Sequence, residues 1–273
     1  MRIYSWKTVE AAAVCPGKIP GQFMDGTALT VGSFDGVHRG HRLLLDAAVR
    51  TGAEKGLAPG AVTFTFPLSR CREADCYAGD LTVLDRRLEL LEAAGMEFAV
   101  VIDFSSDFAK MSGTDFLEIL VRGCGMRFLS EGTDFKCGRG GGTGMAEILR
   151  FADENGIAAG FIPPLAAGGV RISSSRIRGL VLDGDLAGAE VMLGRPYSVD
   201  CRNAVFVLED SCFCMDREAV SQVLPPSGFY NVTAITPEKE IRSRLEVNSQ
   251  KVKLQEFSDN ASPRIRAIEF ISH

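Results

Sequence analysis

Histidine is scarce in this chain: only three occur among 273 residues, and two of them, His38 and His41, stand in one stretch, VGSFDGVHRGH. A surplus of basic residues is also missing, since the formal net charge is −5. Proteins that bind nucleic acid without sequence preference neutralise its phosphates with lysine and arginine. The composition therefore argues against nucleic-acid binding, and an anionic ligand must be met by a local site.

Long apolar runs are missing as well. No segment approaches the ~18 consecutive apolar residues of a membrane-spanning helix. The first ten residues, MRIYSWKTVE, lack the apolar core of a signal peptide. These observations predict a cytoplasmic protein with no membrane association.

Paired cysteines are absent too, because none of the eight cysteines forms a CxxC motif. A chain of this length does not need disulfides to stabilise its core, so we expect reduced thiols. Cys212 and Cys214, in SCFC, leave metal binding open. A CxC without companion pairs nevertheless lacks the spacing of a closed zinc site.

Apolar runs alternate with helix-like segments through the first part of the chain. This pattern predicts about five parallel strands covered by helices on both faces, an α/β domain of Rossmann-like type. The expected strands lie at 28–34, 60–66, 97–104, 126–132 and 157–162, and the expected helices at 41–56, 84–95, 115–123 and 143–156.

The pattern changes after residue 170. Residues 171–194 predict two short helices, with serines before the first and Gly194 after the second. Beyond GRPYSV the chain becomes β-rich, with prolines between apolar pieces such as GFYNVTAI at 228–235. We therefore predict two domains, residues 1–197 and a smaller β-rich, partial-barrel module at 198–273.

VGSFDGVHRGH lies where an open α/β sheet binds ligands. The run ALTV leads into it as a strand and RLLLDAAV follows as a helix, so it forms a turn at a carboxyl strand end. Gly32 and Gly36 allow a tight turn and a close approach to a ligand. The helix start offers free N–H groups and the positive end of its dipole to a phosphate.

The two histidines are three residues apart and share a face if the helix has begun. They would then be able to stabilise charge that develops on a nucleotide phosphate. An N-cap histidine with a core histidine, or a two-histidine metal site, fits the same spacing. HxxH is a common pattern, and its setting is what makes it informative.

RISSSRIR, residues 171–178, is the second candidate phosphate segment. Three serines at a helix start, followed by arginines one turn later, would hold a triphosphate through hydroxyls, N–H groups and guanidinium forks. A capped helix with a solvated basic face explains the same residues.

Together the two segments resemble the nucleotidyltransferase superfamily, which pairs an HxGH loop with an ISSTxIR segment. VGSFDGVHRGH is similar to the GxFDGxHxGH form of bacterial FAD synthetases, which phosphorylate riboflavin and adenylylate FMN. Further matches are VTF at 62–64, SGTDFLEIL at 112–120, GTDFKCG at 132–138 and GDLAGAEVMLGRPYSV at 184–199. The resemblance covers roughly residues 1–200.

The resemblance implies an FMN adenylyltransferase that uses ATP with Mg²⁺, takes FMN as substrate and releases FAD. It implies catalytic roles for His38, His41 and Arg178. The implied ATP-binding residues are Gly32, Ser33, Phe34, Asp35, Gly36, Ser174, Ser175 and Arg176, and the implied flavin-side residues are Phe64, Asp134 and Phe135. It names no metal ligands, and Asp35 is at most a candidate.

The chain departs from the family in three places. FTFPLS replaces a PHP-like stretch, and Cys137 takes an aromatic position, followed by GRGGGTG, which would either clasp a ligand or be disordered. A GFPTAN-like kinase segment is absent between residues 198 and 273, so we expect a degenerate module without riboflavin kinase activity. A sister nucleotidyltransferase with another phosphorylated substrate, or a non-catalytic flavin binder, remains an alternative.

Overall fold

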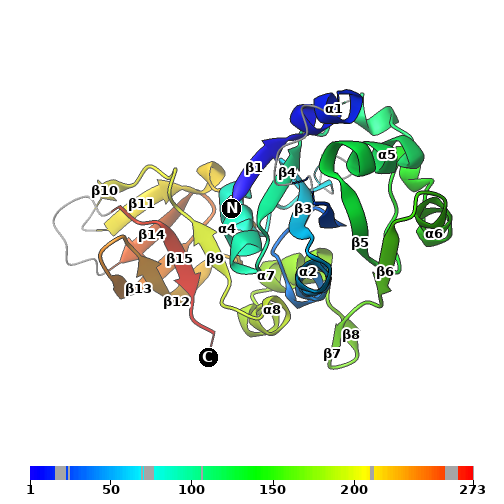
Figure 1. Ribbon diagram of the computed structural model, residues 1–273. Helices are drawn as coiled ribbons and strands as arrows, with labels where there is room; N and C mark the ends of the chain where they lie inside the picture. Colours follow the sequence, from blue (N-terminus) through cyan, green and yellow to red (C-terminus); the bar gives the residue numbers. More distant parts are fainter. Residues whose placement is uncertain are drawn as a thin grey trace. The chain divides into compact units, whose positions relative to one another are not determined.

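The structure is a computed structural model (Figure 1). It describes residues 1–15, 23, 25–68, 70, 77–105, 107–209, 212–255 and 264–272. Contacts divide the chain into two compact units, Met1–Arg72 with Arg87–Leu165, and Glu73–Arg86 with Ala166–His273. The predicted domain boundary near residue 197 stays a prediction.

The first unit holds a six-stranded parallel sheet in the order β1-β4-β3-β2-β5-β6. Chain order reverses at β2, which lies between β3 and β5, so its carboxyl end is a topological switch point, where open α/β sheets bind ligands. The predicted α/β class is confirmed. The strands are β1 (Arg2–Ser5), β2 (Thr27–Val31), β3 (Ala58–Phe64), β4 (Phe98–Ile102), β5 (Met126–Gly132) and β6 (Ala158–Ile162).

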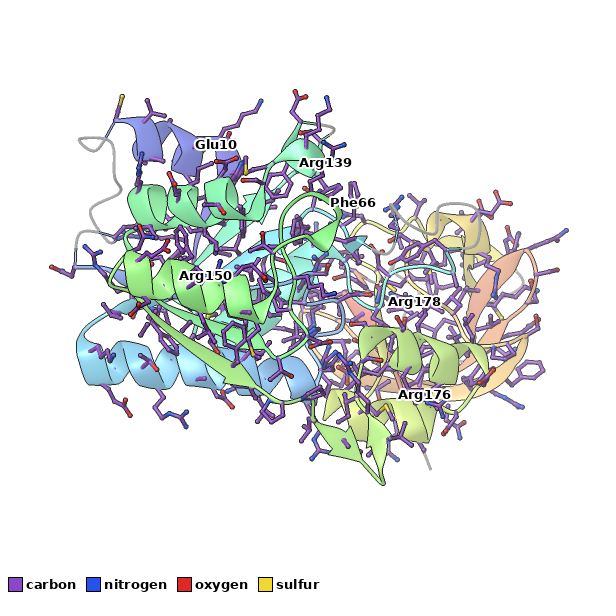
Figure 2. All side chains as sticks on the ribbon, turned by 90° about the vertical axis from the view of Figure 1, so that its right-hand side faces the viewer. Glu10, Phe66, Arg139, Arg150, Arg176 and Arg178 are labelled. Atoms are coloured by element: carbon purple, nitrogen blue, oxygen red, sulfur yellow. The ribbon has the colours of Figure 1, made fainter. Side chains whose placement is uncertain are left out.

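Helices lie on both faces of this sheet (Figures 1 and 2). Buried side chains of α1, α5 and α6 share one apolar cluster with Leu29 of β2. Ser130 of β5 donates to the Leu44 carbonyl of α2 (3.0 Å), and Ser130 points away from the face of Leu129, so α2 covers the other side. The helices are α1 (Trp6–Val14), α2 (Arg39–Lys55), α4 (Leu84–Ala93), α5 (Gly113–Cys124) and α6 (Met145–Glu154), with 3-10 turns η3 (Phe108–Lys110) and η4 (Arg139–Gly141).

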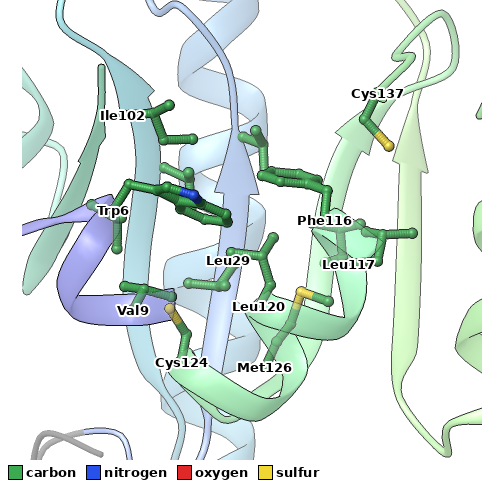
Figure 3. Packing of buried hydrophobic residues seen from close by; sticks show 14 of the residues in the cluster. Trp6, Val9, Leu29, Ile102, Phe116, Leu117, Leu120, Cys124, Met126 and Cys137 are labelled. Atoms are coloured by element: carbon green, nitrogen blue, oxygen red, sulfur yellow. The ribbon is translucent and has the colours of Figure 1, made fainter. Parts of the chain in front are cut away.

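The core explains why these elements form. All five residues of β2 are buried, as expected for the central strand of a parallel sheet. Figure 3 shows Trp6 and Val9 of α1 and Phe116 and Leu120 of α5 packed around Leu29. Each of these helices presents an apolar stripe at the spacing of one helical face.

The sequence predicted about five strands in this sheet, whereas the structure has six, and β1 is the strand that was not predicted. Arg2–Ser5 is an edge strand whose four side chains are exposed or half-exposed, and it pairs only with β4 in the described ladders. Its sequence therefore lacks the alternation of apolar and polar residues that predicts a strand. Helix α1 follows directly, with Ser5 as its N-cap.

The second unit holds two short helices and an antiparallel sheet in the order β10-β11-β14-β13-β12-β15-β9. Ser173 caps the first helix and Gly194, at φ 77°, ends the second, as predicted. Asp185 is the N-cap of the second helix, which was not predicted. The elements are β7 (Ala166–Ala167), β8 (Val170–Arg171), α7 (Ser174–Leu182), α8 (Leu186–Leu193), β9 (Ser198–Asp200), β10 (Val207–Glu209), β11 (Cys212–Asp216), η5 (Arg217–Ala219), β12 (Gly228–Ile235), β13 (Glu240–Val247), β14 (Lys251–Gln255) and β15 (Ala267–Phe270).

Side chains alternate along β13 and β14 between buried and more exposed positions, which is typical of an antiparallel sheet with one solvated face. The predicted β-rich module is therefore confirmed. Among the helices of the described residues, none is both long enough and apolar enough to cross a membrane. Six cysteines are free thiols, while Cys71 and Cys76 lie outside the described residues.

Candidate functional site

The loop between β2 and α2, residues 32–38, has a strained backbone. Phe34 has φ 46° and Val37 has φ 37°, both in the left-handed region, next to Gly36 at φ 82°. A left-handed valine is a genuine outlier, because its branched Cβ crowds the backbone there. Such strain persists only where the surrounding structure holds it, and it clusters at functional sites.

His38 is the N-cap of α2. Its Nδ1 accepts a hydrogen bond from the His41 backbone N–H (3.2 Å), and the side chain is buried. An accepting Nδ1 carries no proton, so in the neutral ring the proton sits on Nε2. The N-cap interpretation of His38 is thus correct, and Nε2 is the donor nitrogen of the neutral ring.

The His41 ring stacks on the His38 ring, with centroids 3.6 Å apart and planes 13° apart. Phe34 packs its edge against His41 (5.2 Å) and covers Gly32, where a Cβ would lie 3.3 Å from the Phe34 ring. Within the described residues, no group of three or more His, Cys, Asp and Glu side chains is arranged to hold a metal ion. The stacking, the contact with Phe34 and the cap hold the two histidine rings in place.

Arg87 of α4 is fully buried and donates hydrogen bonds to the loop. Its Nη1 donates to the Ser33 carbonyl and to the Phe64 carbonyl, each at 2.8 Å. Ser33 is held a second time, since its Oγ accepts from the Leu68 N–H (3.3 Å). These contacts join the loop to the end of β3 and to part of FTFPLS; Ser69 of that motif lies outside the described residues.

Sequence reasoning missed Arg87, although a signal was present. In LDRRLELL, Arg87 lies three residues after Leu84 and four before Leu91, so it falls on the apolar stripe of the helix. An arginine on such a stripe is buried at acceptable cost only where hydrogen-bond acceptors surround its guanidinium.

Glu131 of β5 holds the strand that precedes the loop. Its Oε1 accepts from the Val31 N–H at 2.6 Å, and the side chain is 1% exposed. Burial, and to a lesser degree the charge of Asp134, raises the pKa of Glu131 well above its ordinary value. The sequence signal was an acidic residue inside the apolar strand MRFLSEG.

Phe64, the flavin-side residue of β3, belongs to an aromatic cluster. Its ring lies 6.0 Å from Phe104 and 6.1 Å from Phe108, both half-buried, and Phe108 contacts Phe116 and Trp6 edge-on. The cluster offers aromatic faces near the carboxyl ends of β3 and β4. Phe104 and Phe108 were also missed as flavin-side residues, because Phe104 stands at the end of the expected strand 97–104 and Phe108 belongs to no recognised motif.

Asp134 and Phe135 form a turn directly after β5. The Phe135 N–H donates to the Gly132 carbonyl (2.9 Å), which leaves Asp134 exposed and Phe135 half-buried against the core. Asp134 and Phe135 therefore lie just beyond the carboxyl end of β5, the strand that pairs with β2.

The glycine-rich loop after Cys137 is a closed turn. Backbone hydrogen bonds in both directions join Cys137 and Thr143, and the Arg139 N–H donates to Met111 (2.8 Å) just before α5. Cys137 is buried in the core cluster, which raises its pKa to about 12. Cys137, which stands where the family has an aromatic residue, thus packs in the core, and its thiol is a poor nucleophile.

The RISSSRIR residues lie at the start of α7 in the second unit. Ser173 is the N-cap and accepts from the Arg176 N–H (3.2 Å). Ser174 is half-buried, and Ser175 and Arg176 are exposed. Figure 2 labels Arg176 and Arg178 on this helix.

Arg178 differs from Arg176 in being buried. Its Nε donates to the Gly79 carbonyl (2.8 Å), and its guanidinium lies 5.1 Å from the centre of the Tyr77 ring. The ring face attracts the cation, and the carbonyl fixes its direction. A segment outside the helix therefore sets the orientation of this arginine.

Comparison with known proteins identifies the relatives of this chain. The FAD synthetase family model matches residues 22–176. The chain belongs to the FAD synthetase family. That match includes the 32–38 loop, both histidines and the first residues of α7.

Two relatives carry the name bifunctional riboflavin kinase/FMN adenylyltransferase. The Escherichia coli (strain K12) protein is 32% identical over 179 residues, which are 65% of this chain and 57% of the relative. The Bacillus subtilis (strain 168) protein is 29% identical over 218 residues, 76% of this chain and 67% of the relative. The match thus spans little more than half the length of the E. coli relative.

A solved structure from Streptococcus pneumoniae, titled a macrolide-efflux protein, has the same fold. It superposes with a TM-score of 0.80 at 19% identity and covers 99% of this chain and 89% of its own. At this identity the likeness supports the fold and nothing about function.

Proposed function

We propose that this FAD synthetase family member is an FMN adenylyltransferase, which transfers AMP from ATP to FMN and releases FAD and pyrophosphate. The observation that carries the proposal is the N-capped, stacked pair His38 and His41 at the carboxyl end of β2. The pair lies at a topological switch point and at the start of a 17-residue helix, where phosphate binding is favoured.

In the proposed reaction, a phosphate oxygen of FMN attacks the α-phosphorus of ATP. The new P–O bond forms as the bond to pyrophosphate breaks, so no protein nucleophile is needed. The protein contributes position and charge stabilisation. His38 and His41 donate to the phosphate oxygens as their charge grows, while residues 32–36, namely Gly32, Ser33, Phe34, Asp35 and Gly36, line the adenylyl group.

The start of α7 supplies the triphosphate contacts in this proposal. Ser174 and Ser175 contribute hydroxyls, and Arg178 contributes a fixed guanidinium. Arg176, which is exposed, acts as a helper. Mg²⁺ enters with ATP as part of the substrate, held by its phosphates, since Mg²⁺ commonly reaches such sites on substrate phosphates.

FMN binds in the proposal beside Phe64, Asp134 and Phe135. The neighbouring rings of Phe104 and Phe108 extend this aromatic surface and suit a planar isoalloxazine. Asp134 is exposed in the turn after β5, and in the proposal it meets polar edges of the ligand.

Riboflavin kinase activity is absent in our proposal. The supporting observation is in the sequence: residues 198–273 contain no GFPTAN-like segment, although GFYNVTAI of β12 resembles one strand of the kinase module. We further expect a cytoplasmic enzyme.

The test is to incubate the protein with MgATP and either FMN or riboflavin and to separate the flavin products by chromatography. FAD from FMN and no FMN from riboflavin supports both parts of the proposal. FMN from riboflavin contradicts the loss of kinase activity. No product from either flavin contradicts the proposed function and favours a flavin binder or a sister enzyme, which a panel of phosphorylated substrates then separates.

A further inference from the structure

Residues 77–82, here called the strap, lie between β3 and α4 in sequence and pair with the β-rich part of the second unit. The Asp80 N–H donates to the Ser221 carbonyl (3.0 Å), and the Val223 N–H donates back to the Asp80 carbonyl (2.9 Å). Asp80 and Gln222 thus form a parallel bridge. The strap belongs to the same compact unit as α7 and the antiparallel sheet.

At Gly79 the backbone of the strap packs directly against the backbone of residues 221–223. Gly79 has φ 122°, and a Cβ on it would lie 2.7 Å from the Val223 nitrogen and 2.9 Å from the Ser221 oxygen. Only glycine permits both the conformation and the approach. The strap therefore fits against residues 221–223 in one arrangement.

Gln222 holds the strap as well, and this residue is buried, at 4% exposed. Its Nε2 donates to the Leu81 carbonyl and to the Ser198 carbonyl, each at 2.9 Å, and its Oε1 accepts from the Asp200 N–H (2.7 Å). All of these hydrogen bonds lie within the second unit. They tie the strap to strand β9.

The strap in turn holds Arg178. The Gly79 carbonyl accepts from Arg178 Nε, the Tyr77 ring lies against the guanidinium, and the Tyr77 hydroxyl donates to Asp80 (2.6 Å). A continuous chain of contacts therefore runs from Gln222 through the strap to the arginine. The residues of this chain of contacts are buried or half-buried.

We propose that the β-rich module serves adenylyl transfer: it fixes the strap, and the strap presents Arg178 to the triphosphate. This inference rests on the proposed function, because it uses the role given there to Arg178. Gln222, Gly79 and Tyr77 are positioning residues, and they act by holding the guanidinium in one geometry before ATP arrives. The module then has a task that does not depend on kinase chemistry.

The test measures MgATP binding by calorimetry, and KM for ATP and for FMN, in wild type and Gln222→Leu. Removing the amide frees the strap, so we expect the Kd and KM for ATP to rise about tenfold while KM for FMN changes less than about twofold. Gln250→Leu is the matched control, because Gln250 lies in the same module and its side chain is exposed. It should behave like wild type.

Tyr77→Leu is the second variant, in case Gln222→Leu does not fold. Tyr77 is half-buried, so its loss perturbs the fold less, and we expect about threefold weaker ATP binding. Combining it with Gln222→Leu should add little, because both changes act through Arg178.

The calorimetric readout separates this inference from the proposed function. Weaker ATP binding in both variants supports the inference even if wild type makes no FAD, in which case only the proposed function fails. Unchanged ATP binding and KM in folded Gln222→Leu or Tyr77→Leu overturns the inference, as does a wild type that does not bind MgATP.

Discussion

The loop 32–38 and the start of α7 each carry residues for which we propose phosphate contacts, yet the two segments are held by different means. The backbone of the loop is strained at Phe34 and Val37. Buried Arg87 holds the loop, and buried Glu131 holds the strand before it. The start of α7 is unstrained, with Ser173 as an ordinary cap at φ −153°.

The difference lies in where the constraint comes from. The histidines are fixed by their own loop and the strands beside it, whereas Arg178 takes its orientation from the carbonyl of Gly79 and the ring of Tyr77. Changes near the histidines should therefore act on the chemistry and the local fold. Changes around Arg178 should act mainly on ATP binding.

The largest effect is expected from His41→Ala. Removing a donor that meets the developing phosphate charge should lower kcat by about 10²–10³-fold and leave the FMN Kd nearly unchanged. The measurement is steady-state FAD formation beside FMN titration. Arg42→Ala is the control, because Arg42 is the exposed neighbour and pairs with Asp46; unchanged kcat in His41→Ala would remove His41 from the mechanism.

Arg87→Met should come next and should affect stability as well as turnover. It leaves the Ser33 and Phe64 carbonyls without their donor in a buried setting, which costs about 3 kcal/mol of unfolding free energy. Urea denaturation measures this cost. Arg122→Met, which breaks the exposed pair with Glu118, should cost less than about 0.5 kcal/mol, and equal losses in the two variants would contradict the role given to Arg87.

Gly36→Ala and Gly56→Ala form a matched pair. Both glycines have positive φ, 82° and 66°, so each substitution should cost about 1–2 kcal/mol. Gly56 is the C-cap of α2, at the opposite end of the helix from the histidines, and a Cβ there would meet nothing within 4 Å. We expect only Gly36→Ala to lower kcat beyond what its stability loss explains, and equal activities would show that the loop conformation is irrelevant to turnover.

The smallest effect concerns Glu131 and pH. Because its pKa is raised in the folded state, the stability associated with Glu131 is present below its ordinary pKa and is lost as pH rises toward the folded value. Glu131→Gln keeps an acceptor for the Val31 N–H and does not titrate. The variant should therefore gain stability relative to wild type as pH rises from about 5 to 8, measured as the difference in unfolding free energy; a pH-independent difference would contradict the assignment.

The parallel α/β sheet could be predicted from the sequence because apolar runs and helical segments alternate, and parallel strands require crossover connections. The VGSFDGVHRGH loop was placed correctly between β2 and α2 for the same reason. Strand β1 was not anticipated, since a short exposed edge strand leaves no periodic signal.

By itself the sequence determined the α/β class, the position of the histidines at a helix start, the serine caps of α7 and the β-rich character of the end of the chain. Only the tertiary structure decided that His38 caps α2 through Nδ1, that Arg87 and Glu131 support the loop, and that the strap reaches Arg178. These contacts join residues far apart in the chain, such as Gly79 with Arg178 or Leu81 with Gln222. Periodicity and caps are local properties of the sequence, whereas the partner of a buried polar group is set by the folding of distant segments onto one another.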